Sequence, residues 1–295
     1  MIKTYQRLQL LIAATCVCAA AHANKGPASK IYVADTIGET QIDTGNEVDD
    51  LTKRSVYSAE GTTIGTKANS NASVVFSNGT GVFFDVDTQV QIKTFEQEAF
   101  KPNRTDIEDE PSVSETRIVL DHGVVGISTS KPVAGSTTVY ETPLATAEIR
   151  GRQAVILSED NLTVISMVQG EATVQPGPLG PPLLIKNRQQ IIIKPGKKDG
   201  ENVYVIQDIP DGQAEDDEAW VEERVLTADA ARKLVYFETQ DVKSDSGTVS
   251  VFDGADGANS SSGANSGNKE IVPVPVVPEN PTVQPNVSPA NLVSG

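Results

Sequence analysis

The feature of this chain that most constrains its fold is a long series of short β-branched runs, separated by turn residues, over positions 30–208. Asn78 and Gly79 form the dipeptide most typical of a tight hairpin turn, and they lie between two such runs, 72–77 and 82–86. The further runs are 89–93, 117–121, 124–128, 138–142, 153–158, 162–168, 172–175, 183–186, 189–194 and 202–207.

Short strands at this regular spacing predict an all-β fold, which can be a sandwich, a barrel or a solenoid. The favoured forms are a solenoid or a sandwich. No helix of useful length is visible between positions 30 and 208, which argues against a parallel α/β sheet. Asp160 and Asn161 indicate a second tight turn between antiparallel strands. Gly170 stands where a further strand is expected to begin.

The segment 96–115 interrupts this rhythm with two prolines and the acidic run 106–110. We expect a long surface loop there. A calcium site in the acidic run is the alternative, but the spacing of a calcium-binding loop with its central glycine is missing. A solvated acidic loop is therefore the favoured interpretation.

The character of the sequence changes in 209–240, where we expect one or two short helices. Thr227 is a good N-cap residue, and the acidic residues before Trp220 suit the start of a helix. We expect Trp220, Leu226 and Leu234 to pack onto the β core, with Trp220 a core residue instead of a ligand platform. The residues from 241 to 295 are rich in Gly, Ser, Asp and Pro, which predicts a disordered tail.

Residues 1–23 have the composition of a secretory signal peptide. Lys3 and Arg7 supply positive charge, an apolar stretch follows, and Ala21 and Ala23 match a small-x-small cleavage site before Asn24. The apolar stretch spans about 14 residues, fewer than the roughly 20 that a membrane-spanning helix needs. We expect cleavage, with no stable membrane insertion afterwards; an uncleaved anchor is the alternative.

The positions of the cysteines and the net charge of the chain limit its expected cellular compartment and its expected partners. Cys16 and Cys18 both lie in the signal segment, so the exported chain would hold no thiol, which favours a bacterial periplasmic or extracellular location. The formal net charge of −16 becomes −18 once Lys3 and Arg7 are removed. Such an acidic chain is repelled by phosphate backbones, so nucleic acid and anionic membranes are not expected partners.

Two stretches of the sequence combine turn residues with apolar strands in a specific pattern. The first is Glu-Gly-Thr-Thr-Ile-Gly-Thr at 60–66, followed by Ala-Ser-Val-Val-Phe-Ser-Asn-Gly-Thr at 72–80 and by 86–92. The second and more specific is Thr-Pro-Leu-Ala-Thr-Ala-Glu-Ile-Arg-Gly at 142–151, with the apolar strands after it. Together the two stretches resemble the FecR domain of exported Gram-negative proteins, and the resemblance covers roughly positions 55–195. It implies a FecR-like β domain at 55–208, preceded by N-terminal strands at 24–54.

Departures from the family pattern limit what the resemblance implies. Glu148 stands where the family usually has glycine, and Arg152 where it usually has threonine. FecR regulators also carry a cytoplasmic sigma-factor-binding segment and a transmembrane helix, in place of which this chain has a signal peptide. Arg150 and Gly151 are the candidate contact residues. Gly151 permits a positive φ or close strand packing, and Arg150 could bridge neighbouring carboxylates or carbonyls. A purely structural role of both residues in a turn is favoured over a binding role.

The sequence offers little support for catalysis. His122 is the one histidine after the signal segment, and we expect it in a turn formed by residues 121–123. No Gly-x-Ser-x-Gly occurs, and neither zinc-ligand spacing nor a phosphate-binding glycine loop is present. We therefore predict no catalytic residues, no cofactor and no metal. The favoured function is a non-catalytic module that binds an envelope protein or polymer. The alternatives are a membrane-anchored FecR-type signal regulator, and a glycan-acting enzyme that uses a carboxylate pair.

Overall fold

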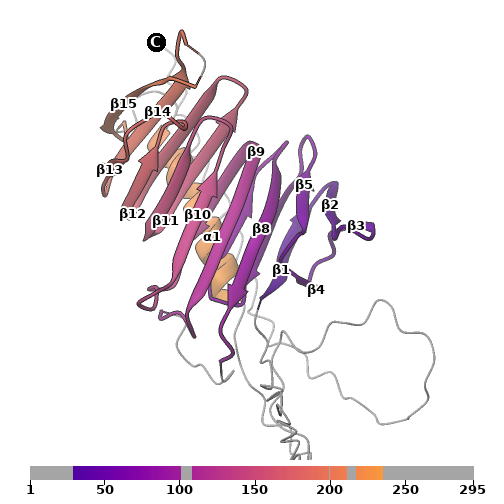
Figure 1. Cartoon of the computed structure of the whole chain (residues 1–295). Coiled ribbons are helices and arrows are strands. Elements are labelled where there is room, and N and C mark those ends of the chain that lie inside the picture. The colour runs from indigo at the N-terminus through magenta and orange to yellow at the C-terminus, as the bar shows by residue number, and fades with distance from the viewer. Residues whose placement is uncertain (1–28, 101–107, 199, 211–216, 235–295) are drawn as a thin grey trace, which may run out of the picture. The chain divides into compact units, whose positions relative to one another are not determined.

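The structure is a computed structural model, and it describes residues 29–100, 108–198, 200–210 and 217–234 (Figure 1). All of them belong to the unit Met1–Ala258. The predicted signal peptide at 1–23 and the predicted disordered tail at 241–295 lie outside the described residues. Among the described helices, none is long and apolar enough to cross a membrane.

The described residues form fifteen strands and one helix, which confirms the all-β prediction. The strands are β1 (Lys30–Ile37), β2 (Thr40–Asp43), β3 (Val48–Asp50), β4 (Val56–Ser58), β5 (Thr63–Thr66), β6 (Asn71–Phe76), β7 (Gly81–Phe84), β8 (Gln89–Gln97), β9 (Ser114–Ser128), β10 (Thr137–Glu141), β11 (Thr146–Glu159), β12 (Leu162–Gln175), β13 (Leu183–Ile185), β14 (Gln189–Pro195) and β15 (Asn202–Asp208). The helix is α1 (Asp217–Leu234).

The strands form one bent sheet whose halves face each other as two layers. The front layer contains β3, β2, β5, β8, the first half of β9, β10, the first half of β11, the second half of β12, and β13. It runs from β13 on the left of Figure 1 to β3 on the right. The back layer contains β4, β1, β6, β7, the other halves of the three long strands, β14 and β15. All pairings between these strands are antiparallel except that of β9 with β10.

The long strand β9 changes its buried phase where it bends. Ile118 and Leu120 point into the core before the bend, and Val125 and Ile127 do so after it. Even positions are therefore inward in the first half and odd positions in the second. Gly123 lies at the change with a φ of +99°. We expected a turn and two short strands here; instead one strand continues, because an irregular residue keeps the apolar side inward while the strand bends.

The same phase change occurs in β11 and β12. The inward residues are Ala147, Ile149, Ala154 and Ile156 in β11, and Ile165, Met167, Ala172 and Val174 in β12. Gly151 of β11 and Gly170 of β12 are paired at the change, and the register of the two strands shifts just beyond them. Gly170 has a φ of +111°, and a Cβ on it would lie 2.1 Å from the Cα of Gly151. Only glycine permits this approach of two backbones.

A single apolar core fills the space between the two layers. Phe76 of the back layer and Phe95 of the front layer meet edge to face, with ring centroids 5.1 Å apart. Ile31, Val33 and Ile42 belong to the same core. The strands from 24–54 therefore share a core with the strands that follow, because β1 pairs with β6 and β2 pairs with β5.

Both predicted tight turns are present. β6 and β7 form an antiparallel hairpin around Asn78 and Gly79, where the backbone N–H of Thr80 donates to the Asn78 side chain at 3.1 Å. β11 and β12 form a second, long hairpin around Asp160 and Asn161. The expected surface loop at 96–115 is shorter than predicted, since β8 extends to Gln97 and β9 begins at Ser114.

The helical prediction was right in place and wrong in detail. One helix of 18 residues forms, as the prediction of one or two short helices allows, and it passes through Thr227. Thr227 is therefore not an N-cap; its hydroxyl donates to the carbonyl of Glu223 at 2.8 Å. Leu226 and Leu234 are 62% and 50% exposed, so the prediction that they pack onto the core was wrong. The buried stripe is instead formed by Val221, Val225, Ala228, Ala231 and Arg232.

The helix lies against the outer side of the back layer, behind the front layer in Figure 1. A Cβ on Gly81 of β7 would lie 2.3 Å from the carbonyl oxygen of Ala228. A Cβ on Gly126 of β9 would lie 2.5 Å from the carbonyl oxygen of Arg224. The two glycines thus let the helix backbone rest directly on the sheet.

We expect Gly126→Ala to destabilise the protein by about 1–3 kcal/mol, because the added methyl meets helix backbone that must move away. Gly65→Ala is the matched control: Gly65 is also a strand glycine with ordinary φ, but nothing lies within 4 Å of its Cβ position. Its effect should stay within about 0.5 kcal/mol. Chemical denaturation of both variants measures the difference, and equal stabilities would contradict this packing.

Candidate functional site

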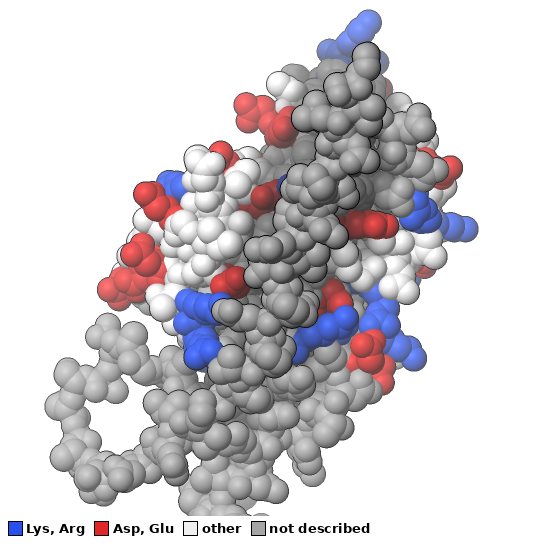
Figure 2. Space-filling view, turned by 180° about the vertical axis from the view of Figure 1, so that it is seen from behind, with Lys and Arg blue, Asp and Glu red and all other residues white. Residues whose placement is uncertain are grey.

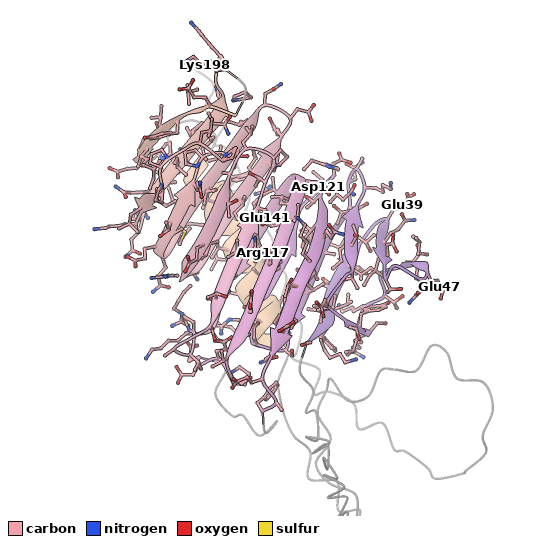
Figure 3. The ribbon with its side chains drawn as sticks, viewed as in Figure 1. Glu39, Glu47, Arg117, Asp121, Glu141 and Lys198 are labelled. Carbon is pink, nitrogen blue, oxygen red and sulfur yellow. The ribbon has the colours of Figure 1, made fainter. Side chains whose placement is uncertain are left out.

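The outer face of the front layer is the candidate functional site, because no described helix or strand packs over it. Outward-facing side chains of β8, β9 and β10 form its centre (Figure 3). These side chains are Gln91, Lys93, Arg117, Val119, Val139 and Glu141. Val119 and Val139 are half-buried, so the centre combines apolar surface with charge.

Glu141 joins the charges of three neighbouring strands. Its Oε2 accepts a hydrogen bond from Lys93 Nζ of β8 at 3.0 Å, and its Oε1 accepts one from the Arg117 guanidinium of β9. Partial burial raises the pKa of Glu141, but the hydrogen bonds and charges of Lys93 and Arg117 outweigh this, so the net pKa is below its usual range. The carboxylate is thus held ionised between two cations. We call Lys93, Arg117 and Glu141 the front ion cluster.

The front ion cluster predicts a pH-dependent effect of Glu141→Gln. Because the pKa of Glu141 is lowered by folding, its stabilising contribution is complete above about pH 4.3 and is lost as the pH falls through the folded-state pKa. The free energy of unfolding of the variant should be lower than that of the wild type by about 0.5–1 kcal/mol at pH 7. The two should be equal near the acid limit, where the wild-type carboxyl group is protonated. Denaturant titrations at several pH values measure this.

Glu171→Gln is the matched control for that titration, since Glu171 is an exposed carboxylate on β12 of the same layer. It should change stability little at any pH. A Glu141→Gln effect that is constant from pH 7 to the acid limit would contradict the ion cluster.

Arg150 and Gly151 lie inside strand β11, not in a turn. Arg150 is exposed on the outer face of the front layer, and its guanidinium donates to Glu148 Oε1 at 2.9 and 2.8 Å. Glu148, the residue that departs from the family pattern, therefore orients Arg150. Gly151 is buried at the bend with an ordinary φ, so close strand packing, not a positive φ, is what requires glycine there.

The preceding turn explains the start of the 142–151 motif. The Thr142 hydroxyl accepts a hydrogen bond from the Ala145 N–H at 3.0 Å and contacts the Thr163 hydroxyl at 3.0 Å. The carbonyl of Leu144 accepts from the Asn202 side chain at 2.7 Å. The motif thus builds the β10–β11 connection and the bend, and it places the charged pair Glu148 and Arg150 on the outer face.

His122 lies at the margin of the front layer, beside a polar hollow of about 340 Å³. Asp43, Lys67 and Asp87 also line it. We expected His122 in a turn, but it belongs to strand β9, next to the bend at Gly123. In the part of the chain that the structure describes, no group of three or more His, Cys, Asp or Glu side chains is placed to hold a metal ion.

A second, shallow hollow of about 530 Å³ lies at the other end of the front layer. Glu96, Glu98 and Glu115 line it, and Glu96 stands directly opposite Glu115 in the β8–β9 register. Like charges in this arrangement repel each other. Beside it, Glu110 is buried and accepts hydrogen bonds from the Ser114 hydroxyl at 2.5 Å and the Val133 N–H at 2.9 Å. This part of the expected acidic loop is therefore folded into the domain.

The helix side contains polar anchors that sequence reasoning missed. Arg224 of α1 pairs with Asp85 after β7, and both side chains are largely buried. The Arg224 guanidinium also stacks on the ring of Trp220, 3.8 Å from its centroid. Trp220 is partly buried and packs against the apolar residues under the helix. The separation of Asp85 and Arg224 along the chain left no local pattern by which to find the pair.

A second polar anchor, Arg232, lies about two helical turns beyond Arg224 in α1. Arg232 is 2% exposed, and it contacts Asp229 at 3.2 Å and the Ser130 hydroxyl at 3.3 Å. Partial burial raises the pKa of Asp229. Hydrogen bonds from Lys233 and Ser128 and the charge of Arg232 lower this pKa by more than burial raises it, so the net shift is downward.

Seen from behind, the described acidic and basic side chains are interspersed (Figure 2).

Comparison with known proteins gives little more. No protein-family model matches the chain, and no curated protein matches it. Two crystal structures of a "putative anti-sigma factor" from Parabacteroides distasonis are similar to it, each with a TM-score of 0.36 and 17% sequence identity. The similarity covers 50% of this chain and 60% of that chain. At this level it assigns neither a family nor a function.

Proposed function

We propose that this chain is an exported, FecR-like, non-catalytic interaction module of the bacterial envelope, and that it binds a partner protein through the outer face of the front layer. One observation carries the proposal: α1 covers the outer side of the back layer, whereas no described helix or strand covers the front face, which holds oriented charges. Charged groups already fixed by ion pairs lose little side-chain freedom on binding.

The composition of the front face suits a protein partner. Val119 and Val139 supply apolar area at the centre, and the front ion cluster and Arg150 surround them with directional charge. The hollow lined by Glu96, Glu98 and Glu115 extends the face with negative charge. A partner with a basic segment would relieve the repulsion there. None of the outward-facing side chains named for the centre is aromatic, which favours a protein over a glycan polymer.

The ionised state of Glu141 suits an ion-pairing role and argues against this carboxyl group as a general acid. A general acid of a glycosidase needs a raised pKa, whereas the net shift of the Glu141 pKa is downward. The FecR-like assignment rests on the residue motifs at 60–80 and 142–151, whose turn and bend residues have structural roles in this fold.

A photocrosslinking amino acid at Thr137 tests the proposed face. Thr137 is exposed at the start of β10, on the same side as Arg117. We expect a discrete crosslinked product with one envelope protein in the producing cell. We expect Arg117→Glu to weaken it severalfold, because a second carboxylate beside Glu141 disrupts the front ion cluster that the partner contacts. Immunoblotting and mass spectrometry measure the product.

The control places the same crosslinker at Leu226, which is exposed on α1. Equal products from Thr137 and Leu226, or a Thr137 product unaffected by Arg117→Glu, would refute binding through the front face.

Export has its own test. We expect fractionated cells to yield a soluble product that begins at Asn24, because the small-x-small site precedes this residue. Intact-mass measurement and N-terminal sequencing determine the start. A membrane-bound product that keeps Met1 would contradict the exported module and favour the membrane-anchored regulator.

A further inference from the structure

Strand β15 is an exposed edge of the described sheet, and it carries no charge from Asn202 to Gln207. It pairs with β14 along its whole length and ends the back layer (Figure 1). Apolar side chains are exposed on both of its faces: Val203 is 56%, Tyr204 39%, Val205 57% and Ile206 37% accessible. From 202 to 207 the strand contains no charge and no proline. Charges and prolines are the features by which monomeric proteins protect an open sheet edge, so this stretch of β15 is unprotected.

The other edges of the described sheet are protected. β3, at the far end of the front layer, is three residues long and includes Asp49 and Asp50. β4 and β13 also have three residues each. A long, apolar and unprotected edge therefore occurs at β15 among the described strands, and it marks a surface that a strand of another molecule would complete.

The hydrogen-bond pattern shows which backbone groups of β15 are available. Ile209 N–H donates to the carbonyl of Arg188 at 2.7 Å, and Gly196 N–H donates to the carbonyl of Glu201 at 2.8 Å. Residues 201 and 209 thus bond toward β14, and by alternation so do the odd positions between them. The N–H and C=O groups of Tyr204 and Ile206 therefore face the open edge.

We propose that β15 pairs with β15 of a second copy of this chain, antiparallel about a two-fold axis at Val205. This register uses all seven residues of the strand. Val205 would face its own counterpart as a non-hydrogen-bonded pair, and Tyr204 would bond with Ile206 of the other copy. At the ends, Asp208 would face Asn202, so no two like charges stand opposite each other.

Charge also favours this surface for self-association. Two copies that each carry a net charge of −16, or −18 once Lys3 and Arg7 are removed, repel each other. A strand whose one charge, Asp208, lies at its end is where they approach at least cost. Added salt should therefore strengthen the dimer by screening, whereas it would weaken pairing with a basic partner. An edge-to-edge contact is smaller than the roughly 1,600 Å² of a standard interface, so we expect a dissociation constant in the micromolar range.

Sedimentation equilibrium of the purified full chain, from about 1 to about 100 μM and at two salt concentrations, tests the proposal. The expected result is a monomer–dimer equilibrium that higher salt shifts toward the dimer. Val205→Lys should weaken association about tenfold or more, since it places two lysines opposite each other at the axis. Leu226→Lys, on the exposed side of α1, is the control and should leave the equilibrium unchanged.

Two further variants distinguish loss of the dimer from misfolding and test the proposed β15–β15 register. Tyr204→Pro removes an N–H that faces the open edge, so it should abolish the dimer without affecting pairing with β14. Val205→Cys, with Cys16 and Cys18 replaced by Ser, should form an intermolecular disulfide on oxidation, and Leu226→Cys should not. A monomer at every concentration, a dimer insensitive to Val205→Lys and Tyr204→Pro, or equal crosslinking of both cysteine variants would overturn the proposal.

Discussion

The structure depends on the bends in β9, β11 and β12, where each strand leaves one layer and enters the other. At each bend the buried positions shift between odd and even, so the same strand keeps its apolar side toward the core. Gly123, Gly151 and Gly170 permit the bends, because two of them have positive φ and the third lies against the backbone of its neighbour. Without these changes of phase, one half of each strand would turn its apolar side chains to solvent.

The two layers differ in what covers them. Gly81 and Gly126 give the back layer a flat outer surface on which the backbone of α1 can rest, and buried arginine pairs hold the helix there. The outer face of the front layer carries an alternation of half-buried valines and charged residues, which suits water or a partner. The proposed partner surface and the proposed dimer edge are therefore separate: one is a face of the front layer, the other is the last strand of the back layer.

Local patterns in the sequence were reliable where the physics is local. The hairpin at Asn78 and Gly79 and the turn at Asp160 and Asn161 form as predicted, because their backbone preferences need no distant contact. The helix was predicted in the right place, but Thr227 was wrongly interpreted as its N-cap. The residues on both sides of Thr227 have helix-forming character, and the packing of Val221 and Val225 on the sheet extends the helix through it. The capping propensity of one residue stabilises a structure less than the packing of an apolar helix face does.

The sequence by itself determined the all-β class, the turn positions and the residues that carry the FecR resemblance, since alternation and turn chemistry are properties of neighbouring residues. Only the tertiary structure decided that pairs of expected strands are single bent strands, that Glu141 lies between Lys93 and Arg117, and that β15 is an open edge. These features depend on which strands become neighbours and in which register. That choice is made by burial across the whole core, and no local pattern records it.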